Sequence, residues 1–277
     1  MITWKERSNL HVQPVSVKSN KVVHMKRAEK TIEQRVRKEK FERKEFYPLL
    51  PKNGNQQDLL DAFKYNAIVV AAGCAGTGKT MLACWHAAKK LHYGDIKKIV
   101  LIRAYQPLAG RSIGFLPGTL EEKLMPYYRQ MIDYFEDFMG KGTVDIHIKQ
   151  GTIEICSLET IRGRSWENSI VIVDESQSLF VPEVQALVTR IGERSQMILC
   201  GDNSGTQTDV RNGTDGLTYL EQLVARYYIP DVAFIRFNVE DIVRSGITKE
   251  FVIAFESEMT CKDPLVSQTE INKQFKK

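Results

Sequence analysis

The sequence predicts an α/β fold in which a mostly parallel sheet is flanked by helices on both faces. Three observations in the 277-residue chain support this prediction. Apolar runs of strand length alternate with helix-like segments about five times, which is the order that βαβ units produce. A glycine-rich turn at 73–80 follows the first apolar run, and the acidic pair Asp174-Glu175 ends a later one. Ligands of such sheets bind beside the carboxyl ends of the strands, so both features point to one edge.

The composition is that of a globular protein, because 43% of the residues are hydrophobic and no apolar run approaches the roughly 18 residues of a membrane helix. The first residues lack the apolar core of a secretory signal. The five cysteines are an odd set without a C-x-x-C pair, which is typical of reduced thiols. We therefore expect a cytoplasmic protein that makes no membrane contact.

The net charge of +5 is concentrated at the start of the chain. Residues 1–52 hold 14 Lys and Arg against 6 Asp and Glu, a net charge of +8, whereas the remaining residues have a net charge of −3. We divide the chain into this basic arm, a main domain at 53–258 and a polar tail at 259–277. The helix-like part of the arm, 25–46, is either a solvated face with Glu–Lys pairs or a contact surface for another partner or for nucleic acid, namely RNA or single-stranded DNA.

The turn at 73–80 reads GCAGTGKT and lies between the apolar run 67–72 and the helix-like run 81–91. This context makes the pattern G-x-x-x-x-G-K-[ST] a phosphate loop. Its glycines let successive backbone N–H groups face phosphate oxygens, and the helix that follows adds the positive end of its dipole. We therefore predict a P-loop protein that binds ATP with Mg²⁺. The residues expected to hold ATP here are Gly73, Cys74, Ala75, Gly76, Thr77, Gly78, Lys79, Thr80 and Met81.

Three side chains around this loop have more specific expected roles. Lys79 is expected to reach the β- and γ-phosphates as a catalytic residue, and Thr80 to place its hydroxyl on Mg²⁺. Gln56 precedes a short helix at 57–64, upstream of the first strand. Its amide carries both a donor and an acceptor, so Gln56 is a candidate ligand for adenine.

The next elements continue the alternation. Gly94 ends the helix that follows the phosphate loop, and 97–103 has the continuous apolar character of a buried strand. An irregular loop leads to a helix at 119–139, opened by a capping box and kinked at Pro126. The aromatic residues of that helix are interpreted as core and lid packing, with a base-stacking platform as the alternative. A short strand is expected at 153–156.

The second decisive segment is 169–177, which reads SIVIVDESQ. Its branched apolar residues predict a buried strand whose carboxyl end carries Asp174 and Glu175. Asp174 is placed to hold Mg²⁺, generally through water, because this ion takes few carboxylates and keeps its waters. Glu175 is placed to orient and deprotonate an attacking water. Together with the phosphate loop, the acidic pair predicts a hydrolytic site.

The last elements complete the sheet. We expect a helix at 182–191, a buried strand at 196–200, a helix at 215–228, a strand at 232–237 and a helix from 240 to about 259. Asp202 and Gln207 follow the strand at 196–200 and face the same edge as Asp174. We expect these two side chains to sense the γ-phosphate.

The chain resembles the PhoH family of P-loop ATPases, in its phage or bacterial members, over about 55–256. The segments that carry the resemblance are NQ at 55–56, GCAGTGKT at 73–80, LIR at 101–103, GFLPG at 114–118, RGR at 162–164, VIVDESQ at 171–177, TRIGERSQMILCGD at 189–202 and VEDIVRSG at 239–246. The resemblance implies a single RecA-like domain, similar to the first such domain of superfamily-one helicases. It also implies Gln56 near adenine, Asp174 on Mg²⁺, Glu175 as the catalytic acidic residue and Gln207 as the γ-phosphate sensor.

This chain departs from the family pattern in two places. The family usually has Arg-Pro and then Glu-Ala-Gly after the second strand, whereas this sequence has Arg103-Ala104 and Leu108-Ala109-Gly110. The family's G-D-x-x-Q has extra residues here, between Gly201 and Gln207. The basic arm lies outside the resemblance. If the chain is a phage member of this family, its expected compartment is the cytoplasm of the bacterial host.

Related helicases build their ATP site between two RecA-like domains, so a single domain supplies only half of such a site. The missing component is an arginine that stabilises the charge developing on the γ-phosphate. Arg244 is the leading candidate and Arg164 the second, although Arg244 has an ion pair with Asp241 or Glu240 as its alternative role. An arginine from a neighbouring subunit requires head-to-tail contacts, which close into rings. We therefore expect a homo-oligomer, with a hexameric ring as one form.

Three functions are compatible with these residues. The first is an ATPase coupled to RNA or DNA, with helicase- or translocase-like activity, which the basic arm and the RGR turn favour. The second is a nucleotide-gated binding module with slow hydrolysis. The third is a P-loop phosphotransferase, which is disfavoured because an acid beside Asp174 suits water activation. The effect of polynucleotide on ATP turnover separates the first two.

Overall fold

The computed structural model describes residues 45–104, 120–202, 215–244 and 246–260. Most of the predicted arm, the loop at 105–119, Gln207 and the tail from 261 lie outside the described residues. Residues 46–52, which belong to the predicted arm, pack on the main domain. Phe46 is buried in its core, and the Trp85 indole N–H donates to the carbonyl oxygen of Tyr47 at 2.9 Å.

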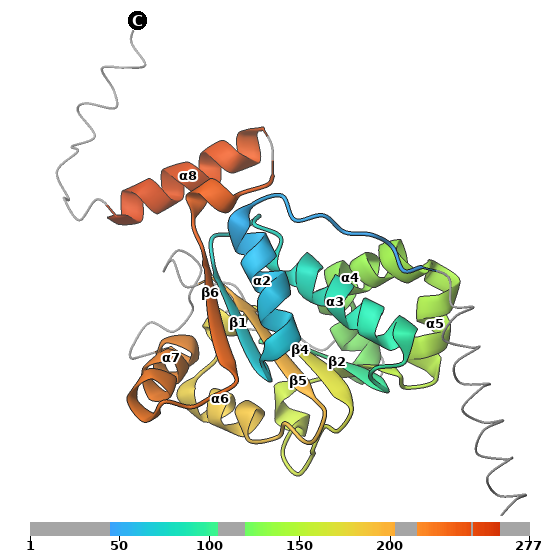
Figure 1. The fold of residues 1–277 in the computed structure, drawn as a ribbon. Helices are drawn as coiled ribbons and strands as arrows, with labels where there is room; N and C mark the ends of the chain where they lie inside the picture. The colour runs from blue at the N-terminus through green and yellow to red at the C-terminus, as the bar shows by residue number, and fades with distance from the viewer. Residues whose placement is uncertain (1–44, 105–119, 203–214, 245, 261–277) are drawn as a thin grey trace, which may run out of the picture. The chain divides into compact units, whose positions relative to one another are not determined.

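The six described strands form one parallel sheet, which confirms the predicted α/β class (Figure 1). The strands are β1 (Ile68–Gly73), β2 (Lys98–Arg103), β3 (Ile153–Cys156), β4 (Ser169–Asp174), β5 (Gln196–Gly201) and β6 (Val232–Phe237). Their order across the sheet is β3-β2-β4-β5-β1-β6, and every pair is parallel. The strand that ends in Asp174 is therefore separated from the strand of the phosphate loop by β5.

Helices cover both faces of the sheet. The helices are α2 (Gly54–Tyr65), α3 (Lys79–Tyr93), α4 (Leu120–Met139), α5 (Lys141–Lys149), α6 (Val181–Val188), α7 (Gly216–Tyr227) and α8 (Ile247–Thr260). One apolar cluster joins α2, α3, α4 and α5 to the sheet, and a second joins α6 and α7 to it. Figure 1 shows α8 apart from these two layers. The fold is thus a sheet between two helical layers.

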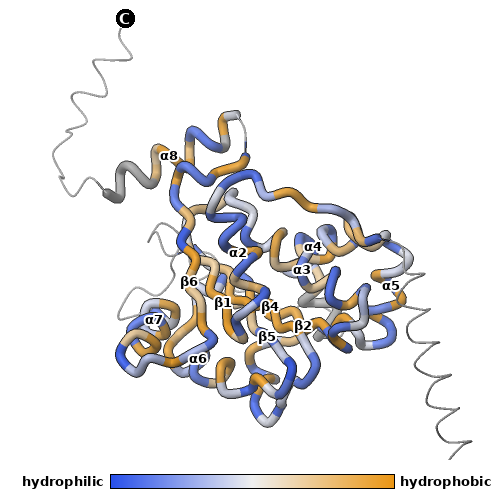
Figure 2. The backbone as a smooth tube through the Cα atoms, viewed as in Figure 1, coloured by the Kyte–Doolittle hydropathy of each residue, from blue (hydrophilic) through white to orange (hydrophobic). Residues whose placement is uncertain are grey.

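The four inner strands, β1, β2, β4 and β5, are mainly apolar because both of their faces are covered. In β1, Val69 and Ala71 belong to the first cluster, whereas Val70 and Ala72 belong to the second. Side chains of a strand alternate between its two faces, so a strand buried on both faces reads as a continuous apolar run. The hydropathy colouring of Figure 2 shows the centre of the sheet as predominantly hydrophobic. This two-sided burial explains why the strands are visible in the sequence.

Two helices differ from the prediction. The helix expected from 240 to 259 begins at Ile247, after a 3-10 turn at Val239–Asp241. The carboxylate of Asp241 accepts hydrogen bonds from Asn55 Nδ2 at 2.7 Å and from its own turn, at Asn238 N, at 2.9 Å. A contact with α2 therefore fixes this turn, and Arg244 lies outside any helix. The helix α5 was not expected from the sequence.

Candidate nucleotide-binding site

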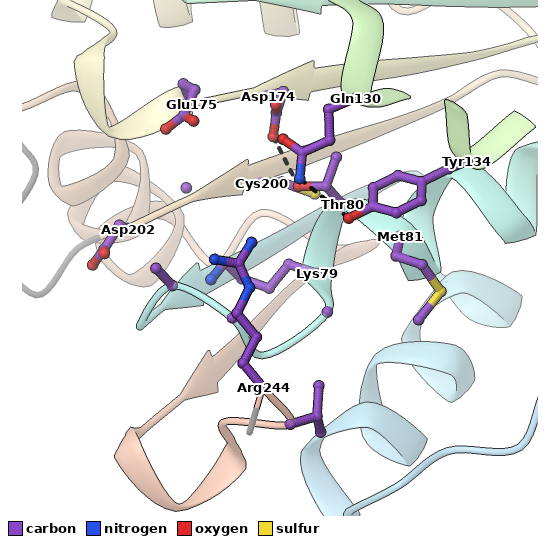
Figure 3. A pocket seen from close by; sticks show the side chains of 15 residues that line it. Lys79, Thr80, Met81, Gln130, Tyr134, Asp174, Glu175, Cys200, Asp202 and Arg244 are labelled. Atoms are coloured by element: carbon purple, nitrogen blue, oxygen red, sulfur yellow. Dashed lines mark hydrogen bonds between the residues drawn. The ribbon is translucent and has the colours of Figure 1, made fainter. Parts of the chain in front are cut away.

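A cavity of about 410 Å³ lies beside the carboxyl ends of the strands (Figure 3). The phosphate loop, the ends of β4 and β5, one side of α4 and the segment after β6 form its walls. Its lining residues are Ala75, Gly76, Gly78, Lys79, Thr80, Met81, Gln130, Tyr134, Asp174, Glu175, Cys200, Gly201, Asp202, Val243 and Arg244. The structure thus brings most of the predicted site residues to one place.

The phosphate loop is shaped by three glycines in conformations that side chains rarely adopt. Gly73, Gly76 and Gly78 have φ values of 132°, 82° and 89°. Gly73 also lies against β6, where an added Cβ would be 1.9 Å from the carbonyl oxygen of Phe237. The loop is closed from within by the Thr77 hydroxyl, which donates to the carbonyl oxygen of Cys74 at 3.0 Å. Glycine is therefore required at Gly73 for both backbone conformation and space.

We expect Gly73→Ala to lower the free energy of unfolding by about 3 kcal/mol, because the new methyl group overlaps backbone and the φ angle becomes strained. Urea unfolding of the purified variant measures the change. Gly142→Ala in α5 is the matched control, since nothing lies within 4 Å of its added Cβ. This control should be neutral or stabilising, by up to about 1 kcal/mol. Equal midpoints for the two variants would contradict the expectation.

Lys79 begins α3 and turns its side chain back into the loop. Its Nζ donates to the carbonyl oxygens of Gly73 at 2.6 Å and Cys74 at 2.7 Å, and to Thr77 Oγ1 at 3.2 Å. Only 8% of the residue is exposed, and this burial lowers the pKa of Lys79, although the nearby charge of Asp202 opposes the shift. Burying an ammonium group costs free energy unless an anion pairs with it. The position of Lys79 therefore favours a negatively charged ligand.

Thr80 and Asp174 form the candidate metal position. The Thr80 hydroxyl donates to Asp174 Oδ1 at 2.8 Å. Burial of Asp174 raises its pKa, as does the charge of Glu175, whereas Arg103 lowers it. A hydroxyl and a carboxylate oxygen are hard donors, and Mg²⁺ typically binds one or two carboxylates together with waters and phosphates. The pair therefore fits Mg²⁺, with Asp174 and Thr80 as the residues that would hold it.

Glu175 follows Asp174 in a left-handed backbone conformation, with φ at 53°. Its Oε1 accepts a hydrogen bond from Arg103 Nη2 at 2.9 Å, and its Oε2 accepts one from Gln177 Nε2 at 2.7 Å. Arg103 Nη1 also lies 3.6 Å from Asp174 Oδ2. Glu175 is thus next to the candidate metal position and is fixed in orientation by two neighbours.

The other predicted site residues do not all line the cavity. Gln56 is buried behind the phosphate loop, where its Nε2 donates to the carbonyl oxygen of Thr77 at 2.9 Å and its Oε1 accepts from Lys52 N at 2.8 Å. Asp202 lines the cavity, and its backbone N–H donates to Gln177 Oε1 at 3.0 Å. Gln207 lies outside the described residues. Cys74 is buried.

The two candidate arginines lie in different surroundings. Arg244 lines the cavity, and the neighbouring Val243 N–H donates to the carbonyl oxygen of Gly76 at 3.1 Å. Among the described residues no ion pair joins Arg244 to Asp241 or Glu240. Arg164 is ion-paired with Glu154 and does not line the cavity. Figure 3 shows the Arg244 side chain reaching toward Lys79.

Three residues near the site, Arg103, Gln177 and Gln130, have no role in the sequence prediction, and a fourth, Tyr134, has a different predicted role. Tyr134 belongs to the aromatic set that was interpreted as packing. It is partly buried against the core but also lines the cavity, where its hydroxyl accepts from Gln130 Nε2 at 3.1 Å. Tyr128 and Phe135 of the same helix are buried in the core, as that interpretation expects. The only sequence signal for the aromatic residues of this helix was their helical spacing. That spacing does not distinguish a core residue from a residue of the cavity wall.

The sheet order, the phosphate loop and the Thr80–Asp174 contact define a P-loop nucleoside triphosphatase fold with a RecA-like sheet. In the part of the chain that the structure describes, no helix has both the length and the apolar character needed to span a membrane. The model of the family described as "PhoH-like protein" matches residues 48–256. The chain belongs to the PhoH family.

Curated relatives agree with this assignment. A PhoH-like protein of Bacillus subtilis (strain 168) is 36% identical over 208 residues, which are 75% of this chain and 64% of that protein. Protein PhoH of Escherichia coli (strain K12) is 32% identical over 211 residues, or 75% of this chain and 58% of that protein. The chain therefore matches less than two thirds of the length of these relatives. Among solved structures, the HK97 bacteriophage large terminase is similar over 74% of this chain and 43% of that chain, with a TM-score of 0.43 and 15% identity.

Proposed function

We propose that this protein binds ATP with Mg²⁺ in the cavity and hydrolyses it. The observation that carries the proposal is the convergence of Lys79, the Thr80–Asp174 pair and Glu175 on one cavity at the carboxyl edge of the sheet. A cation, a pair of metal-binding oxygens and an acid are the groups that phosphoryl transfer to water requires. Lys79 and Thr80 begin α3, whereas Asp174 and Glu175 lie at the carboxyl end of β4, so their proximity depends on the fold.

The proposed roles follow from these positions. The loop N–H groups and Lys79 bind the phosphates, and Lys79 exchanges carbonyl oxygens of the loop for phosphate oxygens. Mg²⁺, when bound at Thr80 and Asp174, supplies positive charge that offsets the charge developing on the phosphates. Glu175 orients the attacking water and accepts its proton. Asp202 follows β5, the strand between β1 and β4, and in this proposal it senses the γ-phosphate.

Arg244 supplies the arginine that stabilises the γ-phosphate in this proposal, and it acts within its own chain. Its place in the cavity supports this role. Arg244→Ala is expected to lower kcat about 10³-fold, because an arginine at the transferring phosphoryl group contributes about 10³–10⁵ in rate. Steady-state ATP hydrolysis measures the loss, and Arg236→Ala, a surface arginine ion-paired with Glu221, is the control. An unchanged kcat in Arg244→Ala would exclude this arginine.

The oligomeric state is a separate part of the proposal. We propose a homo-oligomer as the alternative source of the arginine that stabilises the γ-phosphate, because an arginine supplied by a neighbouring subunit requires head-to-tail contacts, and these close into rings. Equilibrium sedimentation with Mg²⁺ and ATP bound is the test. A monomer with full ATPase activity would refute the oligomer, and it would leave Arg244 as a sufficient arginine within one chain.

We also propose that RNA or single-stranded DNA raises the rate of ATP turnover. The net charge of +8 in residues 1–52 supports contact with a polyanion. The experiment compares ATP hydrolysis alone and with RNA, single-stranded DNA and double-stranded DNA, for the full chain and for a variant without residues 1–45, which keeps the core residue Phe46. Stimulation that disappears with the arm supports the coupling. Equal rates under all conditions favour a nucleotide-gated binding module instead.

A further inference from the structure

Arg103 is held at the edge of the site by contacts on both its main chain and its side chain. Its backbone N–H donates to the Tyr128 hydroxyl at 3.1 Å, and its Nη1 donates to the carbonyl oxygen of Tyr127 at 2.7 Å. The Tyr128 hydroxyl in turn donates to the carbonyl oxygen of Cys156 at 3.0 Å. Only 20% of the Arg103 side chain is exposed. The guanidinium therefore has a fixed position before any ligand arrives.

The sheet register sets this position opposite the acidic pair. Strand β2 pairs with β4 so that Arg103 is the Cα partner of Asp174, and Ala104 N donates to the carbonyl oxygen of Asp174 at 3.0 Å. From there Nη2 reaches Glu175 Oε1 at 2.9 Å. On the other side, Gln177 donates to Glu175 Oε2 and accepts from Asp202 N. The ends of three adjacent strands, β2, β4 and β5, are thus linked through the Glu175 carboxylate.

We propose that Arg103 is a positioning residue for Glu175, which it holds in the orientation needed to direct the attacking water. This inference rests on the proposed hydrolysis. Glu175 has a flexible side chain that is 37% exposed, and the Arg103 fork and Gln177 fix both of its oxygens. A misplacement of about 1 Å in a catalytic group can cost about 10²-fold in rate. Arg103 itself does not line the cavity, so it acts through Glu175 and not on the nucleotide.

The first test is a double-mutant cycle on single-turnover ATP hydrolysis with Arg103→Met, Glu175→Ala and the combination. We expect Arg103→Met to lower kcat about 10²-fold and to change KM for ATP less than about threefold. In the Glu175→Ala background the same change should cost less than about twofold, because Arg103 then keeps only its 3.6 Å contact with Asp174. Arg103→Lys keeps the charge but not the fork, so it should recover only part of the rate. Additive losses, or a change confined to KM, would overturn the proposal.

A second cycle does not depend on hydrolysis. Thermal unfolding of the same three variants without nucleotide should give Tm shifts that depart from additivity by about 2–4 °C, since the partners are in contact. Arg236→Met is the matched control and should leave both kcat and the Glu175→Ala shift unchanged. If the wild-type protein has no ATP turnover, the proposed function fails. The thermal cycle still tests whether Arg103 holds Glu175. Additive Tm shifts would show that Arg103 does not hold Glu175.

Discussion

Lys79→Ala is expected to reduce ATP turnover by at least about 10³-fold and to weaken ATP binding. Removing one donor from a developing oxyanion typically costs about 10²–10³ in rate, and Lys79 is a charged donor in a buried position. The Nζ atom sits within 2.7 Å of two loop carbonyl oxygens, so it occupies the centre of the phosphate loop. Steady-state hydrolysis and equilibrium binding of a fluorescent ATP analogue measure the two effects.

The fold should survive the loss of Lys79, which makes the result interpretable. Burial lowers the pKa of Lys79, and this means that the folded protein disfavours its charged form. Replacing it with alanine removes that cost but also removes three hydrogen bonds, so the unfolding midpoint without nucleotide should change little. Lys90→Ala, at the other end of α3 and paired with Asp95, is the control and should keep wild-type turnover. Normal turnover in Lys79→Ala would disprove the assignment of the cavity as the ATP site.

The parts of the site that could be predicted from sequence are those encoded by short contiguous segments. The phosphate loop depends on glycines and a lysine within eight residues, and the strand before Asp174 is a continuous apolar run because both its faces are buried. These local patterns were enough to predict the sheet and to bring Lys79, Thr80, Asp174 and Glu175 to one edge.

The contacts that could not be predicted depend on which strands become neighbours. Arg103 and Glu175 are separated by 72 positions in the chain, and they meet only because β2 lies beside β4. The start of α8 was misplaced for a similar reason, since the bond between Asp241 and Asn55 fixes a 3-10 turn where local propensity favours helix. Helix α5 was missed because Gly142 and β-branched Thr143 and Val144 are weak helix formers. Burial of Val144 in the core stabilises this helix instead.

Glu175→Gln is expected to separate ATP binding from ATP hydrolysis. The amide keeps the size of the side chain and can still accept from Arg103, but it cannot accept a proton from water, so kcat should fall about 10²–10⁴-fold. The affinity for ATP and Mg²⁺ should stay within about threefold of wild type, because Thr80, Asp174 and Lys79 are unchanged. Single-turnover hydrolysis and ATP binding, measured on the same preparation, check both expectations.

Glu221→Gln is the control for this change, since Glu221 is ion-paired with Arg236 outside the cavity. It should leave both kcat and ATP affinity unchanged. A Glu175→Gln variant that hydrolyses ATP normally would remove Glu175 from the mechanism, and Arg103 would then have no catalytic group to position. A variant that loses binding as well as hydrolysis would instead indicate that Glu175 helps to hold the metal. The ratio of the two losses therefore decides whether the acid after Asp174 acts on water or on Mg²⁺.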